Sequence, residues 1–501
     1  MKTTVFLVGA GPGDPGLITV KAEKLLKIAD VIVYDYLSNP IFLNKANNNC
    51  KLINAGKRLG FKAMSQAQIN KKLVSLAKQK YKNIVRLKGG DPLLFGRGGE
   101  EAEYLKKNKI NFEIVPGITS AIAVPAYAGI PISHRDSTSS FCIVTGHEDP
   151  EKNKSNLNWK AIAAFKSIIF LMGTKNLKSN IGKLIENGID KNSRIAVIQW
   201  GTHSMQKTVE GNLSNIFSLI KQKNIKSPAV IVIGDVCKYR KNLRWFEKKP
   251  LFGKSIVVTR ARKDASNLVE QIFDLGGEAI EIPSIEIKPI FNKKNEIYIK
   301  NSTNYDWLVF TSVNGVEEFF SRFIKFHHDI RRLGKTKIAT IGSETARSVK
   351  KYGLKVDLIP KKFIAESLIK EFKNQKVKEN KILIPRAAKS RELLIEELRK
   401  MDNKVDEMKI YKSILPSKKL KNNIRDRIMN ENIFGITFTS SSTVDNFFKF
   451  IDSKTLKRNK KIKFFCIGPI TANTLKKYNL RPNKIAKEFT IKSLINEVIK
   501  S

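Results

Sequence analysis

Cysteine, histidine and long apolar runs are scarce in this sequence, and each scarcity excludes a class of protein. The four cysteines, Cys50, Cys142, Cys237 and Cys466, lie far apart without a Cys-x-x-Cys pair, so the sequence predicts neither a disulfide framework nor a zinc site. The five histidines lack metal-ligand spacing as well. No apolar run is long enough to span a membrane, and no secretory signal follows Met1. We therefore expect a cytoplasmic protein without a bound metal or a membrane partner.

Acidic residues are also few in comparison with basic ones. The chain has 92 lysine and arginine residues against 46 aspartate and glutamate residues, which gives a formal net charge of +46. Such a charge is compatible with a nucleic acid or another polyanionic partner. The lysines are scattered over the whole chain, however, and are not interleaved with aromatic clusters that could stack on bases. We therefore favour solvated basic surfaces over a nucleic-acid interface, and a carboxylate-rich substrate would tolerate them too.

Glycine is concentrated in residues 85–101, which read Val-Arg-Leu-Lys-Gly-Gly-Asp-Pro-Leu-Leu-Phe-Gly-Arg-Gly-Gly-Glu-Glu. An apolar strand is predicted to end here, and Asp91 follows in the turn. Glycines allow a ligand to approach the backbone closely, and ligands of open α/β sheets bind at the carboxyl ends of strands. A single Gly-Asp-Pro would indicate an ordinary turn, but five glycines between residues 89 and 99 favour a ligand site.

A second glycine-rich loop, Gly-Ala-Gly-Pro-Gly-Asp-Pro-Gly at residues 9–16, follows the strand-like run 5–8. It imitates the dinucleotide-binding fingerprint, with Asp35 about 20 residues further on, where a ribose-binding acid would stand. Pro12 and Pro15, however, fix the backbone and remove two N–H donors that such a loop needs to hold a phosphate. We therefore predict a ligand without phosphate, and NAD remains a minor alternative.

Strand-like and helix-like segments alternate throughout the chain, which predicts an α/β fold with mainly parallel sheets. The length of 501 residues allows two to four domains. A charged and poorly periodic stretch indicates a boundary near residues 240–253. We therefore expect one domain in residues 1–245, a linker in residues 246–252 and a second domain in residues 253–501.

The second half contains an internal duplication at an offset of 126 to 128 residues. Four blocks recur in the same order: 255–260 match 381–386, 307–312 match 435–440, 338–346 match 464–472, and 363–368 match 489–494. We therefore expect two similar α/β lobes, with a cleft between them as the ligand site.

Two charged residues of the first half are predicted at the ends of neighbouring strands. Asp35 ends the apolar run 30–35, and Lys57 follows the run that begins at Ile53. A carboxylate and an ammonium group in such places can act as base and acid, or form a salt bridge, and the spacing alone favours the salt bridge.

Several longer motifs of the first half carry a family resemblance. They are Val-Gly-Ala-Gly-Pro-Gly-Asp (8–14), Val-Tyr-Asp (33–35), Gly-Lys-Arg (56–58), Arg-Leu-Lys-Gly-Gly-Asp-Pro (86–92), Phe-Gly-Arg-Gly-Gly-Glu-Glu (95–101), Val-Pro-Gly-Ile-Thr-Ser (115–120) and Gly-Ile-Pro-Ile-Ser-His-Arg-Asp (129–136). With them, residues 1 to about 245 closely resemble uroporphyrinogen-III C-methyltransferases of the tetrapyrrole methylase superfamily. That resemblance implies two α/β subdomains, a homodimer and S-adenosylmethionine, a methyl donor without phosphate.

The same resemblance assigns the residues of the site. It implies cofactor contacts at Pro12, Gly89, Gly90, Asp91, Leu94, Thr119, Ser120, Met172 and Gly201. Asp35 and Lys57 fall on the positions proposed as proton acceptor and proton donor. Leu94 and Ser120 depart mildly from the family, in which Ile and Ala are frequent at these positions, and both changes conserve size.

The second half resembles uroporphyrinogen-III synthases through another set of blocks. These are Val-Val-Thr-Arg (257–260), Phe-Thr-Ser-Val-Asn-Gly (310–315), Ile-Gly-Ser-Glu-Thr-Ala (341–346), Ile-Tyr (410–411), Phe-Thr-Ser-Ser-Ser-Thr-Val (438–444) and Ile-Gly-Pro-Ile-Thr-Ala (467–472). The resemblance implies two lobes joined by two crossings of the chain, the first lobe being completed by the C-terminal portion. A departure follows Arg386, where relatives often have glycine and this chain has Ala387.

Hydroxyl and basic side chains of this half are candidates for binding a carboxylate-rich substrate. They are Arg260, Thr311, Ser312, Arg386, Thr439, Ser440 and Thr471. The Thr-Ser pairs follow predicted strands, so each is at least as compatible with a helix N-cap. Tyr411 matches the tyrosine proposed in the family to assist departure of a hydroxyl group, because a phenol can donate a proton.

Both resemblances together imply a bifunctional enzyme of tetrapyrrole biosynthesis. One half would close hydroxymethylbilane to uroporphyrinogen III, and the other would methylate that product twice to precorrin-2, on the way to siroheme or cobalamin. The alternative is a basic methyltransferase of the same superfamily that acts on RNA and carries a C-terminal binding module; the motifs around Lys57 and at residues 129–136 favour the tetrapyrrole branch. No dehydrogenase or ferrochelatase domain is assigned, so we expect neither oxidation of precorrin-2 nor iron insertion.

Overall fold

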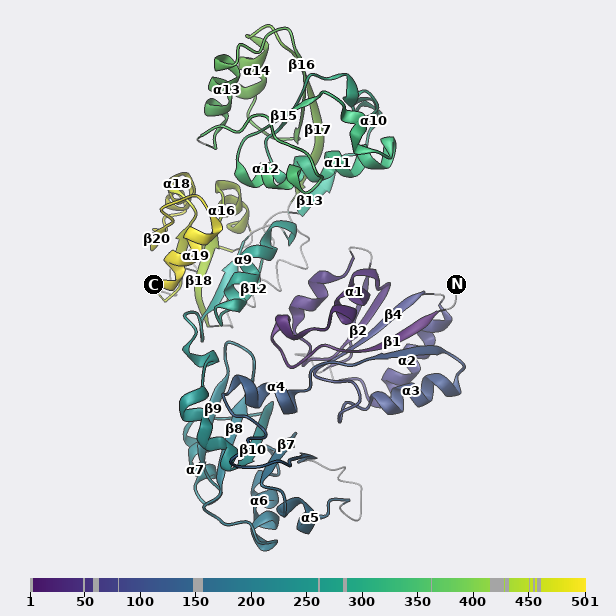
Figure 1. Ribbon diagram of the computed structural model, residues 1–501, viewed down its shortest axis with the longest axis vertical. Helices are drawn as coiled ribbons and strands as arrows, with labels where there is room; N and C mark the ends of the chain where they lie inside the picture. The colour runs from purple at the N-terminus through teal and green to yellow at the C-terminus, as the bar shows by residue number, and fades with distance from the viewer. Residues whose placement is uncertain are drawn as a thin grey trace.

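The computed structural model describes most of the chain. The described residues are 3–47, 50–56, 63–79, 81–146, 156–259, 262–282, 286–361, 363–414, 428, 432–449, 451–453, 456 and 461–501. They contain four five-stranded sheets, each flanked by helices (Figure 1). Among the described helices, none combines the length and the apolar character that crossing a membrane requires.

The first sheet is entirely parallel, with the strand order β3-β2-β4-β1-β5. The helices of this segment connect its parallel strands by crossovers. Because the strands run in one direction, their carboxyl ends meet at one edge of the sheet. The helix α1 begins after Thr19, whose hydroxyl caps the first turn by accepting from the Ala22 N–H. The elements are β1 (Thr4–Gly9), α1 (Val20–Ile28), β2 (Val31–Tyr34), η2 (Pro40–Lys45), β3 (Lys51–Asn54), α2 (Gln66–Lys78), β4 (Asn83–Lys88), α3 (Gly98–Lys107) and β5 (Asn111–Val115).

The second sheet has the order β6-β7-β10-β8-β9, and only its β6–β7 pair is parallel. The expectation of mainly parallel sheets is therefore wrong for this sheet. The physical reason is the short connection from β8 to β9, which suits antiparallel neighbours and is too short for a crossover helix. The elements are α4 (Ser120–Tyr127), β6 (Cys142–Thr145), α5 (Trp159–Ala163), β7 (Ser167–Leu171), α6 (Leu177–Glu186), β8 (Arg194–Gln199), β9 (Lys207–Asn212), α7 (Ile216–Gln222) and β10 (Ala229–Gly234).

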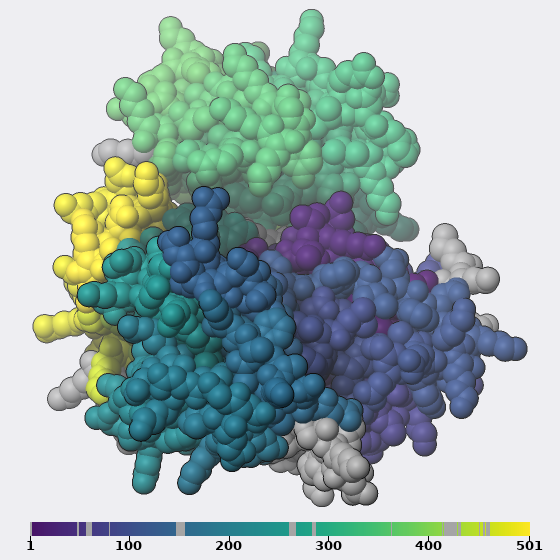
Figure 2. Space-filling view, turned by 60° about the horizontal axis from the view of Figure 1, so that its bottom comes forward, coloured from purple at the N-terminus to yellow at the C-terminus, as the bar shows by residue number. Residues whose placement is uncertain are grey.

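The C-terminal half forms two lobes, as the sequence predicts. In the first lobe the strand order is β12-β11-β18-β19-β20, and in the second it is β13-β17-β16-β14-β15. The first lobe contains residues 255–282 and the described residues from 428 onward, whereas the second contains residues 286–414, so the chain crosses between the lobes twice. In Figure 2 the green residues of the second lobe form the uppermost body.

The elements of the first lobe are β11 (Ser255–Val258), α9 (Arg262–Asp274), β12 (Glu278–Glu281), β18 (Ile433–Phe438), α16 (Ser441–Phe447), β19 (Lys463–Cys466), α18 (Pro469–Lys477), β20 (Lys484–Ile485) and α19 (Ile491–Ile499). Those of the second lobe are β13 (Glu286–Pro289), α10 (Lys293–Lys300), β14 (Trp307–Phe310), α11 (Val313–His327), β15 (Lys337–Thr340), α12 (Ser343–Lys350), α13 (Ala365–Asn374), β16 (Lys381–Ala387), α14 (Leu393–Arg399) and β17 (Lys404–Ile414).

Each lobe combines strands from both sequence repeats. The first lobe joins β11 of the first repeat to β18 and β19 of the second, and the second lobe joins β16 of the second repeat to β14 and β15 of the first. The duplication thus produces two similar sheets, but neither repeat is a lobe by itself.

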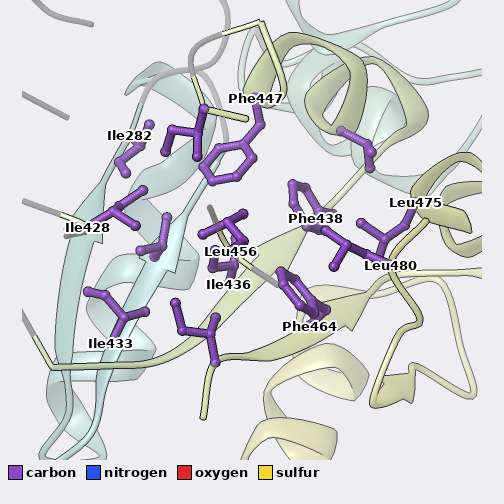
Figure 3. Close-up of a cluster of buried hydrophobic side chains, with 14 of the residues drawn as sticks. Ile282, Ile428, Ile433, Ile436, Phe438, Phe447, Leu456, Phe464, Leu475 and Leu480 are labelled. Carbon is purple, nitrogen blue, oxygen red and sulfur yellow. The ribbon is translucent and has the colours of Figure 1, made fainter. Parts of the chain in front are cut away.

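The core of the first lobe depends on this exchange (Figure 3). Ile280 and Ile282, from the segment before the second lobe, pack with Phe438, Phe447 and Phe464, from the segment after it. The side chains of Phe438 and Phe447 are fully buried. Truncation of a buried Phe to Ala typically costs about 3–5 kcal/mol, so this lobe needs both segments.

The connection between the two halves is packed against them. It includes η3 (Asp235–Tyr239), α8 (Arg240–Leu243) and η4 (Phe246–Lys248). The Phe246 ring is buried and lies 4.8 Å from the ring of Tyr127 and 5.4 Å from that of Phe252. The buried Arg240 guanidinium pairs with Glu210 and Glu247, each at 2.7 Å. These contacts hold the segment around Arg240 and Phe246 against α4 and β9.

Candidate functional site

The two glycine-rich loops predicted from the sequence lie side by side at the ends of β1 and β4. The Gly11 N–H donates to the Gly90 carbonyl at 3.2 Å, and the Gly90 N–H donates to the Gly11 carbonyl at 2.7 Å. Both residues have positive φ angles, +75° and +68°, which glycine adopts without the steric cost of a Cβ atom. The two loops therefore form one site, as expected for strands that end at the same edge.

The glycines of these loops have two different functions. A Cβ atom on Gly9 would lie 2.5 Å from the Gly117 Cα atom and 2.7 Å from the Gly90 oxygen, so Gly9 permits close packing of backbones. A Cβ atom on Gly90, in contrast, would meet only the Ser120 nitrogen, at 3.8 Å. Gly90 therefore borders open space, and this is where the backbone can contact a ligand.

The Asp91 carboxylate is used to hold the loops. Its Oδ1 atom accepts hydrogen bonds from the N–H groups of Leu93 (2.8 Å) and Leu94 (3.1 Å), and its Oδ2 atom accepts one from Gly117 (3.1 Å). Asp91 thus fixes the loop after β4 to the loop that precedes α4. Thr119 caps α4 by accepting from the Ala121 N–H at 3.2 Å.

The second sheet adds two strand ends to the same region. Met172 follows β7 and is 51% exposed, and its φ of +57° is unusual for a residue with a side chain. Gly201 follows β8 and packs so closely on α4 that a Cβ atom would overlap the Val124 side chain. Thr202 accepts a hydrogen bond from the Asp14 N–H at 3.1 Å and so joins this strand end to the loop after β1.

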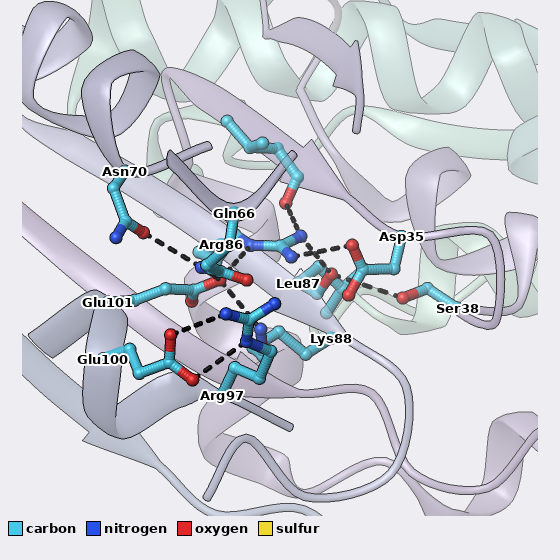
Figure 4. A network of polar contacts seen from close by, with 11 residues as sticks. Asp35, Ser38, Gln66, Asn70, Arg86, Leu87, Lys88, Arg97, Glu100 and Glu101 are labelled. Carbon is cyan, nitrogen blue, oxygen red and sulfur yellow. Dashed lines mark hydrogen bonds and ion pairs between the residues drawn. The ribbon is translucent and has the colours of Figure 1, made fainter. Parts of the chain in front are cut away.

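Asp35 belongs to a network of charged side chains beside the glycine loops (Figure 4). Its carboxylate pairs with the Arg86 guanidinium at 2.7 Å. The Arg86 Nε atom and the Lys88 Nζ atom both contact the Glu101 carboxylate, at 3.2 Å and 2.8 Å. Asp35 therefore forms an ion pair with Arg86, whereas the predicted pairing of Asp35 with Lys57 stays a prediction. Lys57 lies outside the described residues.

Burial makes this network unusual. The side chains of Arg86, Lys88 and Glu101 are 2%, 4% and 0% exposed, whereas that of Asp35 is 29% exposed. Burial, and then the neighbouring Arg86 charge, lower the pKa of Lys88, while Glu101 acts in the opposite direction. Asp35 is therefore the second carboxylate of the network, after the buried Glu101. It lies at the solvent-exposed rim, where Arg86 fixes its position.

In the second lobe, two of the predicted residues meet. The hydroxyl groups of Tyr411 and Ser312 are 2.9 Å apart, and either can be the donor. The Ser312 hydroxyl also caps α11, because it accepts from the Gly315 N–H at 3.1 Å. Tyr411 is 6% exposed, so its phenol lies at the surface of the core beside the start of a helix.

The remaining hydroxyl candidates lie at the starts of helices. Ser440 caps α16 by accepting from the Thr443 N–H at 3.2 Å, and Thr471 is buried in the first turn of α18. The structure thus shows the N-cap that the sequence offered as the alternative for Ser312 and Ser440. Thr311 and Thr439 directly precede these two caps and are half-buried.

The Arg386 guanidinium binds other residues of the second lobe. Its side chain is 3% exposed and pairs with Glu392 at 3.1 Å and Glu407 at 3.2 Å, while the Ser390 carbonyl accepts from Nη2 at 2.8 Å. These partners hold the Arg386 guanidinium in place, and its predicted contact with substrate stays a prediction. The register of β16 shifts between Arg386 and Ala387, at the departure noted in the sequence. Arg260 lies outside the described residues.

Within the described ranges, no three His, Cys, Asp or Glu side chains come together in a way that could hold a metal ion. All four cysteines are free thiols.

Comparison with known proteins supports both resemblances. Residues 4–216 match the family of tetrapyrrole (corrin/porphyrin) methylases, and residues 266–496 match uroporphyrinogen-III synthase HemD. The porphyrin biosynthesis protein HemD of Ruminiclostridium josui is 37% identical over 497 residues, which cover 99% of this chain and 97% of that protein. An S-adenosyl-L-methionine-dependent uroporphyrinogen III methyltransferase of Methanosarcina barkeri is 52% identical over 233 residues, 46% of this chain and 91% of that protein.

A solved structure is similar to the first half. It is the uroporphyrin-III C-methyl transferase of Thermus thermophilus complexed with S-adenyl homocysteine, with 31% sequence identity and a TM-score of 0.41, covering 47% of this chain and 99% of that chain.

Fold, site and relatives define a tetrapyrrole methylase joined to a uroporphyrinogen-III synthase. The chain belongs to the family of such fused proteins that includes the porphyrin biosynthesis protein of Ruminiclostridium josui. The identification of both halves from their motifs is confirmed.

Proposed function

We propose that this chain is a bifunctional enzyme that closes hydroxymethylbilane to uroporphyrinogen III and then methylates it twice to precorrin-2. The observation that carries the proposal is the paired glycine loop, where Gly90 borders open space beside the Asp35 carboxylate network. The Gly11 loop contains Pro12 and Pro15 and is poor in N–H donors, which fits a donor without phosphate. S-adenosylmethionine supplies an electrophilic methyl group when bound there.

The chain contributes to methyl transfer mainly by positioning. Holding a pyrrole carbon in line with the methyl group, about 3–3.5 Å away, can contribute several kcal/mol to lowering the barrier. The residues proposed to border the donor are Pro12, Gly89, Gly90, Asp91, Leu94, Thr119, Ser120, Met172 and Gly201. In this set Gly90 and Gly201 supply backbone, and Asp91 keeps the loops in place through its three accepted hydrogen bonds.

Asp35 is proposed to accept the proton that the methylated ring loses. Its carboxylate is the most exposed member of the charged network, and Arg86 holds it at the rim. Lys57 is proposed as the proton donor on the basis of its motif.

The synthase half is proposed to work at the facing edges of its lobes. The helices α11 and α12 of the second lobe and α16 and α18 of the first begin directly after strands, and Figure 1 shows the two pairs facing each other. Helix N-termini attract carboxylates, and so would the basic surface. The Tyr411 phenol is proposed to donate a proton to the departing hydroxyl group, with Ser312 fixing its orientation.

We propose that residues 1–245 form the methyltransferase half and residues 253–501 the synthase half. The product of the synthase half is then the substrate of the methyltransferase half. By family resemblance we propose a homodimer through the methyltransferase half. A reducing cytoplasm is proposed as the location, and the four free cysteines are compatible with it. The product feeds siroheme or cobalamin synthesis in this proposal.

Separate assays of the two halves test the proposal. Hydroxymethylbilane alone should yield uroporphyrinogen III in place of isomer I, which forms spontaneously. Uroporphyrinogen III with S-adenosylmethionine should yield products one and two methyl groups heavier. Absence of methylated uroporphyrinoid, together with methyl transfer to RNA supplied in a parallel reaction, would overturn the methyltransferase assignment.

A further inference from the structure

The loop between β8 and β9, residues 200–206, has a strained backbone. Trp200 and Thr202, on either side of Gly201, have φ angles of +49° and +69°. Residues with side chains in this region cost roughly 1–3 kcal/mol each and persist only when their surroundings determine them. The conformation of the Gly201 loop is therefore set by the groups that hold it.

Part of that support comes from the methyltransferase half. The Thr202 N–H donates to the Gln206 side chain at 3.0 Å, and the Thr202 hydroxyl accepts from the Asp14 N–H. Asp14 in turn accepts from the Tyr127 hydroxyl at 2.7 Å. The His203 ring lies edge-on to Trp200, with 5.5 Å between the ring centroids. These contacts tie the loop to β1 and α4.

The rest comes from the connection and the first lobe. The Ser204 carbonyl accepts from the Gly253 N–H at 3.1 Å, and the Ser204 hydroxyl donates to the Glu278 carboxylate at 3.3 Å. Ser204 is 6% exposed and Glu278 is half-buried, so the hydrogen bond between their side chains is partly shielded from water. A cavity of about 10 Å³ at this junction is lined by residues of both halves, among them Gly13 and Phe273.

The apolar contacts of the halves reinforce this junction. Ile41, which lies in η2 after the Asp35 loop, packs against the first-lobe core around Leu251, Leu268 and Ile272. Asn39 donates to the Gly13 carbonyl at 2.8 Å and so holds the loop after β1 from the same side. The first lobe therefore contacts the two segments that border the methyl-donor site.

The first lobe uses opposite edges for its two neighbours. Gly253 precedes β11 and Glu278 opens β12, so the amino ends of these parallel strands face the methyltransferase half. Thr439 and Ser440 follow β18 at the carboxyl ends, which face the second lobe. A change at Glu278 therefore lies at the edge away from the synthase residues.

We propose that Glu278, acting through Ser204, is a positioning residue for methyl-donor binding, so that the synthase half supports the cofactor site of the methyltransferase half. The proposal rests on the proposed function, in which the Gly201 loop borders S-adenosylmethionine. Because the coupling is reciprocal, donor binding also stabilises the contact between the halves.

Calorimetric titration of the full chain with S-adenosylhomocysteine tests this coupling. Each of the variants Glu278→Ala and Ser204→Ala loses a hydrogen bond to a charged group. Because part of its free energy supports the donor site, each variant should bind S-adenosylhomocysteine about three- to tenfold more weakly. Glu278→Gln keeps an acceptor and should restore most of the affinity. Glu270→Ala removes an exposed carboxylate of the same lobe and should bind like the wild type. In assays of methyl transfer, Glu278→Ala should raise KM for S-adenosylmethionine and leave kcat nearly unchanged. The rate of ring closure by the synthase half should not change.

Wild-type affinity in Glu278→Ala and Ser204→Ala overturns the coupling. Failure of the wild type to bind S-adenosylhomocysteine overturns the proposed methyl-donor site itself, and the coupling with it. Should Glu278→Ala also lose ring closure, Ser204→Ala decides, because its change lies within the methyltransferase half.

Discussion

Substitution of Gly90 by valine should abolish binding of the methyl donor while the protein still folds. The position has a φ of +68°, and an added Cβ would have no neighbour closer than the Ser120 nitrogen at 3.8 Å. The Gly90→Val variant should therefore fold, because its side chain enters open space. The same side chain occupies the space through which the backbone is proposed to approach the methyl donor.

The magnitude follows from these two effects. A left-handed backbone costs a residue with a side chain roughly 1–2 kcal/mol, which lowers stability but leaves most molecules folded. Excluding the donor from its backbone contacts should lower affinity by at least about 100-fold, or ~2.7 kcal/mol. Gly9→Ala should behave differently, because its Cβ would press on the backbones of Gly117 and Gly90 and destabilise the fold.

The assay is calorimetric titration with S-adenosylhomocysteine, beside thermal unfolding of each variant. Gly188→Val is the matched control, since Gly188 also has a positive φ (+99°) with nothing within 4 Å of its Cβ position, in the turn after α6. It should unfold earlier and bind normally. Normal binding by Gly90→Val would refute the placement of the donor, and an unfolding temperature far below that of Gly188→Val would refute the claim of open space.

Three further predictions concern single side chains. Asp35→Ala should lower kcat of methyl transfer with unchanged S-adenosylhomocysteine affinity, and normal turnover would remove its role as a base. Tyr411→Phe should slow ring closure and shift the product toward uroporphyrinogen I, whereas an unchanged rate and ratio would exclude Tyr411 from the mechanism. Burial lowers the pKa of His203 from 6.5 to about 4, and the charge of Asp14 acts against this shift. Between pH 4 and 6.5 the unfolded chain therefore binds more protons than the folded chain. The free energy of unfolding should therefore fall as pH drops from 6.5 to 4, by up to about 3 kcal/mol. Urea titrations should show a weaker pH dependence in His203→Gln, and equal dependence would count against this origin.

The sequence was sufficient for the glycine loops because their chemistry is local. Gly11 and Gly90 follow strands, and the rule that parallel strands end at one edge is enough to bring them together. Local chemistry also predicted a ligand without phosphate, since Pro12 and Pro15 remove phosphate-binding N–H groups, whereas the identity of the methyl donor came from the family resemblance.

The charged network was missed because it depends on tertiary packing. Arg86 and Lys88 interrupt an otherwise apolar strand, and only the fold places Glu101 of α3 against both. Two ionic residues at alternate positions of a buried strand were the available signal, since buried charges are almost always paired.

The duplication shows a different limit of the sequence. The repeated blocks predict two similar sheets, but a repeat does not specify which sheet each of its strands joins. The exchange of β11 and β16 between the lobes appears only in the tertiary structure, where residues of both repeats share the core around Phe438 and Phe447.

The central claim is that one chain performs both reactions in sequence. Its direct test is a single reaction of the full chain with hydroxymethylbilane and S-adenosylmethionine carrying a ¹³C-labelled methyl group, with products followed by mass spectrometry and NMR. The wild type should give precorrin-2 that carries two labelled methyl groups, and Gly90→Val should give unmethylated uroporphyrinogen III. Formation of isomer I alone, or of uroporphyrinogen III that never gains a labelled methyl group with the wild type, would contradict it.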